Sequence, residues 1–170
     1  FAVCSNVCCN RKKRNGRNSF MNRLIFGADD YLKTWVAKQI GIDGFGPSVA
    51  IGVQRDGEII AAAVYHDLRQ GQIEASIAST SLRWASRSVL HALFAYPFHQ
   101  VGATRLLVQC SEANEKAMKM NRQLGFTQEG RLRQLYAPHD AILWGMLKDE
   151  CKWIEGQTNG KIKPTTAANA

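Results

Sequence analysis

The sequence lacks a long apolar run. The longest, residues 59–65, has seven residues, whereas a membrane-spanning helix needs about 18 or more. Residues 1–20 also lack the continuous apolar core of a secretory signal. These two absences predict a protein without a membrane segment, and we expect it to be cytoplasmic.

Acidic residues are absent from the first twenty positions, which hold five basic ones: Arg11, Lys12, Lys13, Arg14 and Arg17. The whole chain has a formal net charge of +8, so this leader leaves only +3 for the remainder. A basic excess indicates an anionic partner such as a nucleic acid. Because the excess is concentrated in the leader, nucleic acid is an unlikely partner for the rest of the chain, and nucleic-acid binding stays an alternative that depends on residues 1–20.

Cysteine is scarce, with five residues, and three of them form Cys-x-x-x-Cys-Cys within the leader. That spacing does not supply the fourth ligand of a typical zinc site. A lipidated cluster and a nucleic-acid arm are other interpretations, but we expect residues 1–20 to be a disordered or non-native leader before a start at Met21. Cys110 and Cys151 stand alone, which indicates buried thiols in a reducing compartment.

A second full domain has no room in 170 residues, of which 45% are hydrophobic. One globular domain with a sizeable core fits this length. After residue 154 the chain turns polar and low in complexity, which is typical of disorder. We therefore predict a single domain over residues 21–154 and a disordered tail over 155–170.

The first half of that domain predicts a short strand, a helix and an antiparallel meander. Asp29 and Asp30 offer a helix N-cap and Gly41 a helix end. Asp56-Gly57 between two apolar runs is a strong hairpin signal. The predicted elements are a strand at 22–26, a helix at 29–40, a glycine-rich loop at 41–47, and strands at 48–54, 58–66 and 72–79.

The second half predicts a crossover helix and a parallel strand pair. Apolar residues at helical spacing indicate a helix over 86–101, kinked near Pro97. A buried strand follows at 104–110, and a strand, helix and strand in this order imply parallel pairing. The last predicted elements are a helix from the N-cap Asn114 to Gly125 and strands at 127–132 and 141–147, separated by a polar loop.

The segment 81–88, Ser-Leu-Arg-Trp-Ala-Ser-Arg-Ser, lies between the third meander strand and the crossover helix. A turn that opens a helix presents free backbone N–H groups and the positive end of the helix dipole, which suits a diphosphate. Its two arginines and its serines add charge and donors. Taken alone, the segment is equally consistent with a basic, serine-capped helix start that binds nothing.

Three motifs in this element order carry a resemblance: Arg83-x-x-Ser86-x-Ser88, Asn114-x-x-Ala117 and Leu124-Gly125-Phe126. Over roughly residues 48–147, with the first strand and helix included, the chain resembles the GNAT superfamily of acyl-CoA-dependent N-acetyltransferases. The resemblance implies an α/β fold with a mixed central sheet of about six to seven strands flanked by helices. It also implies acetyl-CoA as co-substrate and no metal.

Short segments of the sequence resemble two branches of that superfamily. Arg83-Trp84-Ala-Ser-Arg87, Tyr96-Pro97-Phe98 and Tyr65-His66-Asp67 resemble a small branch often encoded by phages and prophages. Gly125-Phe126-Thr-Gln-Glu129-Gly130 is similar to the start of a late strand in the ribosomal-protein-alanine acetyltransferases.

The resemblance implies a cofactor-binding set that follows the bound acetyl-CoA along its length. The turn would hold the diphosphate, the start of the second helix motif would orient the pantetheine arm, and a backbone N–H at the end of the preceding strand would stabilise the oxyanion. The residues of the turn are Arg83, Trp84, Ala85, Ser86, Arg87 and Ser88. Those at the start of the later helix are Asn114 and Ala117, and those at the end of the strand are Ile77, Ala78 and Ser79.

Three side chains are candidates for proton transfer. An attacking amine is mostly protonated at neutral pH, so it needs a base. The resemblance places that base at Glu74, although a solvated strand glutamate is the simpler interpretation. His66 is the second candidate base because histidine titrates closest to neutral pH, and Tyr136 is a candidate acid. A water is the alternative to Tyr136 as the acid, and Trp35, Phe45 and Tyr136 are candidate walls of an acceptor pocket.

Two positions depart from the superfamily pattern. Ser86 and Ser88 stand where glycine lets the backbone approach the diphosphate. A right-handed helical backbone at Ser86 would tolerate this change, whereas a left-handed one would not. Asn121 stands where many members have a tyrosine that protonates the leaving thiolate. A thiol has a pKa of about 8.5, so CoA can leave as a thiolate near neutral pH.

The expected function is transfer of the acetyl group of acetyl-CoA to a primary amine by direct attack. Protein N-termini, lysines and small amines all remain open as acceptors. The alternatives are a non-catalytic acyl-CoA-binding module and nucleic-acid binding through the leader. A homodimer is a further expectation.

Overall fold

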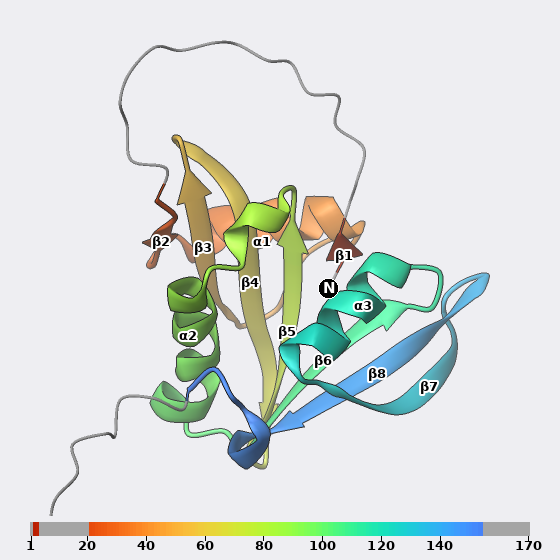
Figure 1. Ribbon diagram of the computed structural model, residues 1–170. Coiled ribbons are helices and arrows are strands. Elements are labelled where there is room, and N and C mark those ends of the chain that lie inside the picture. The colour runs from red at the N-terminus through yellow and green to blue at the C-terminus, as the bar shows by residue number, and fades with distance from the viewer. Residues whose placement is uncertain (1, 4–20, 155–170) are drawn as a thin grey trace, which may run out of the picture.

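The computed structural model of the chain describes residues 2–3 and 21–154. Within them, seven strands follow one path through a mixed sheet in the order β2-β3-β4-β5-β6-β8-β7 (Figure 1). This confirms the predicted α/β sheet. The strands on the path are β2 (Arg23–Ile25), β3 (Val49–Arg55), β4 (Glu58–Arg69), β5 (Gln72–Ser79), β6 (Arg105–Ser111), β7 (Thr127–Tyr136) and β8 (His139–Leu147).

All neighbours on that path are antiparallel except β5 and β6. The connection between those two strands runs through the 3₁₀ turn η1 (Leu82–Trp84), the helix α2 (Arg87–Ala95) and the π-helical turn η2 (Tyr96–Gln100). A helical crossover returns the chain in the same direction, which is why the pair is parallel. The predicted parallel pair is therefore confirmed.

Helices cover both faces of the sheet. Helix α1 (Asp29–Ile40, orange in Figure 1) packs on β3, β4 and β5 from one side and closes a small core with them. Helix α2 and α3 (Glu115–Leu124) lie on the other side, over the larger core. Successive residues of a strand point to opposite faces, so Ile73, Ala75 and Ile77 of β5 enter the α2–α3 core.

The start of α1 differs from the prediction. Ala28 occupies the N-cap, and Asp29 instead accepts a hydrogen bond of 2.6 Å from the backbone N–H of Ala50 on β3. The helix packs so closely that a Cβ on Gly52 would lie 2.7 Å from Leu32 Cδ2. The first helix is therefore tied to the sheet rather than capped by its own aspartates.

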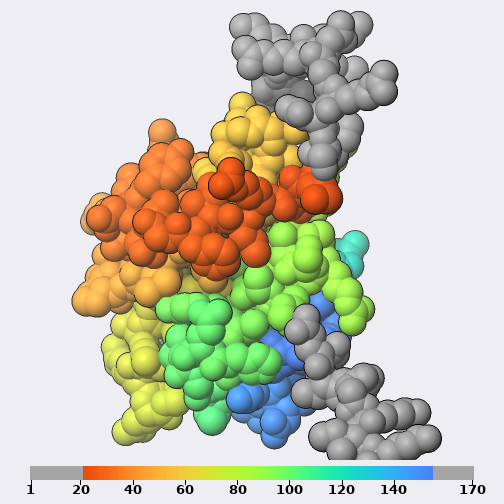
Figure 2. Space-filling model, turned by 90° about the vertical axis from the view of Figure 1, so that its left-hand side faces the viewer, coloured from red at the N-terminus to blue at the C-terminus, as the bar shows by residue number. Residues whose placement is uncertain are grey.

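The predicted interruption of the helix near Pro97 is confirmed, because α2 ends at Ala95 and the chain continues as the π-helical turn η2. Below it, the C-terminal 3₁₀ turn η3 (Lys148–Glu150) brings Trp153 onto the ring of Phe94, with ring centroids 6.3 Å apart. Figure 2 shows α2 (green) and this C-terminal segment (blue) side by side.

The predicted polar loop near residue 138 is wrong, since strands occupy most of it. β7 continues to Tyr136 and β8 begins at His139, with a cis Ala137–Pro138 bond between them. Two register shifts interrupt the pairing of β7 with β8. They also interrupt the two-residue alternation by which a strand is predicted from sequence. The hairpin extends beyond the body of the sheet (Figure 1).

The short strand β1 (Ala2–Val3) pairs in parallel with the end of β5. The expected absence of structure in the leader therefore does not extend to these two residues. The rest of the leader and the predicted tail at 155–170 lie outside the described residues. Cys110 and Cys151 are buried free thiols, as expected.

In the part of the chain that the structure describes, no helix combines the length and the apolar character needed to cross a bilayer.

Candidate active site

The site is organised by the separation of β5 from β6. The two strands pair only through Gln72–Glu74 and Arg105–Leu107. Beyond these residues they diverge, and β5 leads to η1 while β6 leads to α3 (Figure 1). We call the region between residues 75–79 of β5 and 108–111 of β6 the divergence. Predicted cofactor residues lie at its open end, and the predicted base lies where it begins.

The turn at the open end is fixed by one local and one long-range hydrogen bond. Ser81 Oγ accepts from the backbone N–H of Arg83 at 3.3 Å, and Asn22 Nδ2 donates to the carbonyl of Arg83 at 2.8 Å. The first helical hydrogen bond of α2 runs from the Leu90 N–H to the Ser86 carbonyl. The N–H groups of the intervening residues 87–89 therefore have no carbonyl acceptor within the helix, which makes this end a suitable anion site.

Both serine departures fit this backbone. Ser86 is the N-cap of α2 with φ −72°, so it avoids the left-handed conformation that would require glycine. Its hydroxyl lies 3.3 Å from that of Ser88 in the first turn of the helix. The hydroxyls of Ser86 and Ser88 therefore lie at the end of α2 where the backbone N–H groups of residues 87–89 have no acceptor within the helix.

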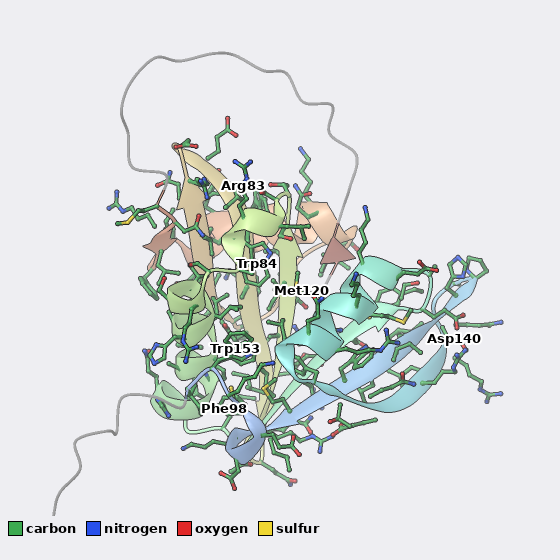
Figure 3. The ribbon with its side chains drawn as sticks, in the orientation of Figure 1. Arg83, Trp84, Phe98, Met120, Asp140 and Trp153 are labelled. Atoms are coloured by element: carbon green, nitrogen blue, oxygen red, sulfur yellow. The ribbon has the colours of Figure 1, made fainter. Side chains whose placement is uncertain are left out.

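The side chains of the turn separate into two sets. Arg83 and Arg87 are exposed, as a phosphate site requires, and Ala85 is half-buried. Trp84, predicted with the cofactor residues, is only 1% exposed and belongs to the large core. Figure 3 shows Arg83 on the outer side of the turn and Trp84 below it. Trp84 therefore anchors the turn from within the core.

The end of β5 forms the side of the divergence. Ile77, Ala78 and Ser79 are buried, and β1 pairs with this edge, aligning Ala2 with Ala78 and Val3 with Ser79. A strand edge offers unpaired N–H and C=O groups to any extended ligand. The two leader residues therefore occupy the edge that was predicted to bind the cofactor.

The start of α3 faces the divergence from β6. Asn114 accepts from the backbone N–H of Ala117 at 3.0 Å and so caps α3, while Ala117 itself is fully buried. Asn121 is also fully buried, and its Nδ2 donates to Cys110 Sγ at 3.7 Å. Its Oδ1 has no hydrogen-bond partner among the described residues. The asparagine that replaces the usual tyrosine thus points into the protein.

Glu74 and His66 are directly paired across β4 and β5, on the face of the sheet that α1 covers. Burial raises the pKa of the Glu74 carboxyl above its usual range, although the nearby His66 opposes that shift. Gln109 of β6 also hydrogen-bonds this carboxylate. Glu74 is thus a half-buried carboxylate at the base of the divergence, as a general base requires.

His66 makes hydrogen bonds through both ring nitrogens. Nδ1 donates to Asp67 Oδ2 at 2.7 Å, and Nε2 lies 3.0 Å from Ser76 Oγ. The hydrogen bond from His66 is the main cause that lowers the pKa of Asp67. The ligand atoms of His66, Asp67 and Glu74 all lie within 4.8 Å of one another. A metal would have to displace one of the hydrogen bonds of His66, which favours an acid–base cluster.

A backbone irregularity makes the His66–Asp67 contact possible. Adjacent residues of a regular strand point to opposite faces. The β4–β5 register shifts after His66, and Asp67 has φ 52°. Aspartate tolerates this left-handed conformation better than most residues, and a bulge can redirect a side chain. The bulge turns the Asp67 carboxylate back onto its own neighbour.

Tyr136 and Phe45 come to this cluster from distant elements. Tyr136, at the end of β7, is 38% exposed. Burial raises the pKa of its phenol, with further contributions from Cys110 and Glu74, so it keeps its proton at neutral pH. The rings of Phe45 and His66 have centroids 5.4 Å apart. Trp35, the other predicted pocket wall, packs against the small core under α1.

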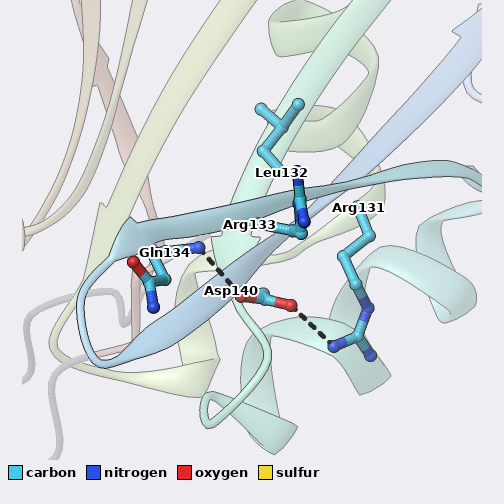
Figure 4. A pocket seen from close by; sticks show the side chains of 5 residues that line it. All are labelled: Arg131, Leu132, Arg133, Gln134 and Asp140. Carbon is cyan, nitrogen blue, oxygen red and sulfur yellow. Dashed lines mark hydrogen bonds and ion pairs between the residues drawn. The ribbon is translucent and has the colours of Figure 1, made fainter.

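The β7–β8 hairpin carries a separate open pocket of about 660 Å³, lined by Arg131, Leu132, Arg133, Gln134 and Asp140 (Figure 4). Asp140 accepts from the Gln134 N–H at 2.8 Å and from Arg131 at 2.9 Å. The first of these contacts is the main cause that lowers the pKa of Asp140. These contacts hold the bulged end of the hairpin.

Neither a protein-family model nor a curated protein matches the chain. Solved structures do match. A mutant spermidine/spermine N-acetyltransferase from Vibrio cholerae has a TM-score of 0.60 at 12% identity, with 76% of this chain and 96% of that one covered.

Two further structures match at lower coverage. The ribosomal-protein-S5-alanine acetyltransferase from Vibrio fischeri has a TM-score of 0.52 at 21% identity, with 62% of this chain and 64% of that one covered. A probable acetyltransferase has a TM-score of 0.50 at 22% identity, with 61% and 63% covered. This chain has the GNAT fold. It spans just under two thirds of the length of these last two proteins.

The GNAT fold gathers some residues that the sequence did not single out. Asp67 and Ser76 complete the hydrogen bonds of His66, and Gln109 contacts Glu74. Ser76 shares the face of Glu74 by the two-residue period of β5, which was a usable signal. Asp67 had no such signal, because its position depends on the bulge.

Proposed function

We propose that the protein transfers the acetyl group of acetyl-CoA to a primary amine by direct attack of the amine on the thioester. The observation that carries the proposal is the β5–β6 divergence, with the half-buried carboxylate of Glu74 at its start and the candidate anion-binding turn of α2 at its open end. An acyl-CoA has a phosphate-rich end and a reactive thioester end, and this arrangement suits both.

In this proposal the α2 turn binds the diphosphate. The exposed Arg83 and Arg87 supply charge-assisted hydrogen bonds, and the first N–H groups of α2 supply the remainder. The pantetheine arm follows the edge of β5 at Ile77, Ala78 and Ser79, beside the buried start of α3. Because β1 lies on that edge, acetyl-CoA must displace it.

Glu74 is the proposed general base. Its raised pKa brings its proton affinity closer to that of the amine, which makes proton transfer easier at neutral pH. His66 is the second candidate and lies opposite on β4. Tyr136 keeps its phenolic proton and is the proposed donor to the leaving thiolate. A backbone N–H of β5 stabilises the oxyanion.

The acceptor is proposed only as a primary amine. The spermidine/spermine and ribosomal-protein-alanine acetyltransferases that share the fold act on different amines, at identities of 12% and 21%. Carboxylates of Glu74 and Asp67 beside the ring of Phe45 would attract a cationic amine. A homodimer and a cytoplasmic location stay predictions.

The decisive experiment is calorimetric titration of the full chain with acetyl-CoA, followed by a free-thiol release assay over a panel of amines. Binding and amine-dependent thiol release support the proposal. Binding without release on a broad panel supports the second candidate, a non-catalytic acyl-CoA-binding module, which the buried Asn121 in place of a tyrosine favours. Absence of binding contradicts both.

Nucleic-acid binding through the leader is the remaining alternative. Its basic residues lie outside the described residues. Deletion of residues 1–20 should abolish any salt-sensitive binding to DNA or RNA, and binding that survives the deletion would exclude the leader as its cause.

A further inference from the structure

Ser76, His66 and Asp67 form an unbroken chain of hydrogen bonds on the α1 face of the sheet. Asp67 Oδ2 lies 2.7 Å from His66 Nδ1, and His66 Nε2 lies 3.0 Å from Ser76 Oγ. A carboxylate, an imidazole and a hydroxyl in this order are the elements of a nucleophilic triad, which is recognised by geometry rather than by position in the sequence. The direct acetyl transfer described above does not use Ser76.

The tautomer of His66 follows from its partners. An ionised carboxylate can only accept a hydrogen bond, so the contact with Asp67 places the ring proton on Nδ1. The lone pair of Nε2 then faces the hydroxyl of Ser76, which donates to it. His66 is therefore oriented to take the proton of Ser76.

The fold holds all three groups without help from a ligand. Ser76 lies on β5 two residues after Glu74, the cross-strand partner of His66, so it is the diagonal neighbour of His66 on the same face. The bulge after His66 turns Asp67 onto the other ring nitrogen. His66 has a side-chain exposure of 14%, and Phe45 covers its ring at 5.4 Å. The imidazole of His66 is thus held by Asp67 on β4, by Ser76 on β5 and by the ring of Phe45.

Ser76 also has access to a substrate. Its side chain is half-buried. Ser76 lies two residues beyond Glu74, which is the last residue of β5 that pairs with β6. Over the described residues, the β5 edge facing β6 has no strand partner between Ala75 and Ile77. Backbone N–H groups on that edge are available to an oxyanion.

We propose that Ser76 is the nucleophile of a second activity, the hydrolysis of small activated acyl groups such as acetyl esters and thioesters, with His66 as its base and Asp67 as the positioning residue. Ser76 Oγ attacks the acyl carbonyl carbon, its proton passes to His66 Nε2, and the alcohol or thiol departs with that proton. Water then attacks the acyl-serine, gives its proton to His66, and the carboxylic acid leaves as Ser76 regains a proton.

The test uses p-nitrophenyl acetate as the probe, because this ester needs no CoA-binding site. The full chain is mixed with the ester, nitrophenolate release is followed from the first moments, and acid-quenched protein is analysed by intact mass and peptide mapping. We expect an initial burst and one acetyl group on the peptide that contains Ser76. We expect Ser76→Ala to remove both, with a loss of about 100-fold or more in rate.

Controls separate a nucleophile from a structural serine. Ser48→Ala, which changes a serine in the loop before β3, should keep the burst. Asp67→Asn should slow acylation while the acetyl group still appears on Ser76. If Ser76→Ala does not fold, Ser76→Cys should place the acetyl group on the sulfur at position 76.

Two results would overturn this proposal: no acetyl group on the Ser76 peptide of the folded wild-type chain, or equal burst rates in wild type and a folded Ser76→Ala variant. Either result leaves acetyl-CoA titration and amine-dependent thiol release untouched. Conversely, an acylated Ser76 in a chain that does not bind acetyl-CoA would contradict the acetyltransferase proposal alone.

Discussion

The two ends of the β5–β6 divergence are built in different ways. At the open end, the candidate anion-binding groups come from the consecutive residues 81–88, and Asn22 and the buried Trp84 tie this turn to the rest of the protein. At the other end, the acid–base cluster joins β4, β5, β6 and β7, and its members are far apart in sequence. The candidate anion-binding groups therefore come from one short segment, whereas the candidate proton-transfer groups are brought together by strand register and packing.

The largest expected effect lies at the acid–base end. Glu74→Gln should lower the rate of acetyl transfer about 100-fold, because a positioned general base contributes about 10²- to 10⁴-fold. The amide keeps the shape of the side chain, so the dissociation constant of acetyl-CoA should stay nearly unchanged. Steady-state kinetics and calorimetry on the same preparation check both statements.

The pH profile tests the same assignment. Because burial raises the pKa of Glu74, the base is lost by protonation as pH falls, and the rate should decline at a pH above the usual range of a glutamate. The charged or titratable groups around it are His66, Asp67 and Arg69 from β4 and Tyr136 from β7. An unchanged acidic limb in Glu74→Gln would transfer the role of base to His66.

At the binding end, Arg83→Ala should weaken acetyl-CoA binding about tenfold or more, since a hydrogen bond to a charged group contributes about 1.5–3 kcal/mol. The pH dependence of the rate should stay as in the wild type. Arg133→Ala removes an exposed arginine of the β7–β8 hairpin and serves as the matched control. Equal losses in both variants would indicate a general charge effect and not a phosphate contact.

A smaller effect is expected from the leader. Deleting residues 1–20 removes β1 from the edge of Ala78 and Ser79. A backbone hydrogen bond contributes a net of about 1 kcal/mol, so the deletion should strengthen acetyl-CoA binding about fivefold. Calorimetry on both chains measures it, and a synthetic peptide of residues 1–20 added to the shortened chain should compete. Weaker binding after the deletion would show that the leader contributes to the site.

The smallest effect is expected at Ser86. Because its φ is already negative, Ser86→Gly removes a hydroxyl without relieving any backbone strain. Acetyl-CoA affinity should change by less than about 1 kcal/mol, the net contribution of one neutral hydrogen bond. A large gain in affinity would show that the serine Cβ obstructs the diphosphate and that the turn adapts on binding.

Much of the fold could be predicted because its signals are local. Apolar periodicity located the helices and strands to within a few residues, and Gly41 and Gly125 mark helix ends in the left-handed conformation. Both strands of the β7–β8 hairpin were predicted, but its end at residues 133–140 was not, because the two register shifts and the cis Ala137–Pro138 bond interrupt the two-residue period.

The candidate site likewise contains residues that local sequence signals predicted and residues that they did not. The candidate phosphate turn could be predicted from the sequence, since free N–H groups at a helix start, serine caps and arginines are properties of adjacent residues. The family resemblance marked Glu74 as a candidate base, and residue type marked His66. Only the tertiary structure decided that Trp84 faces the core, that β1 covers the edge of β5, and that Ser76 and Asp67 both reach His66. These contacts depend on strand register, on a bulge with a positive φ and on long-range packing, which no local pattern encodes.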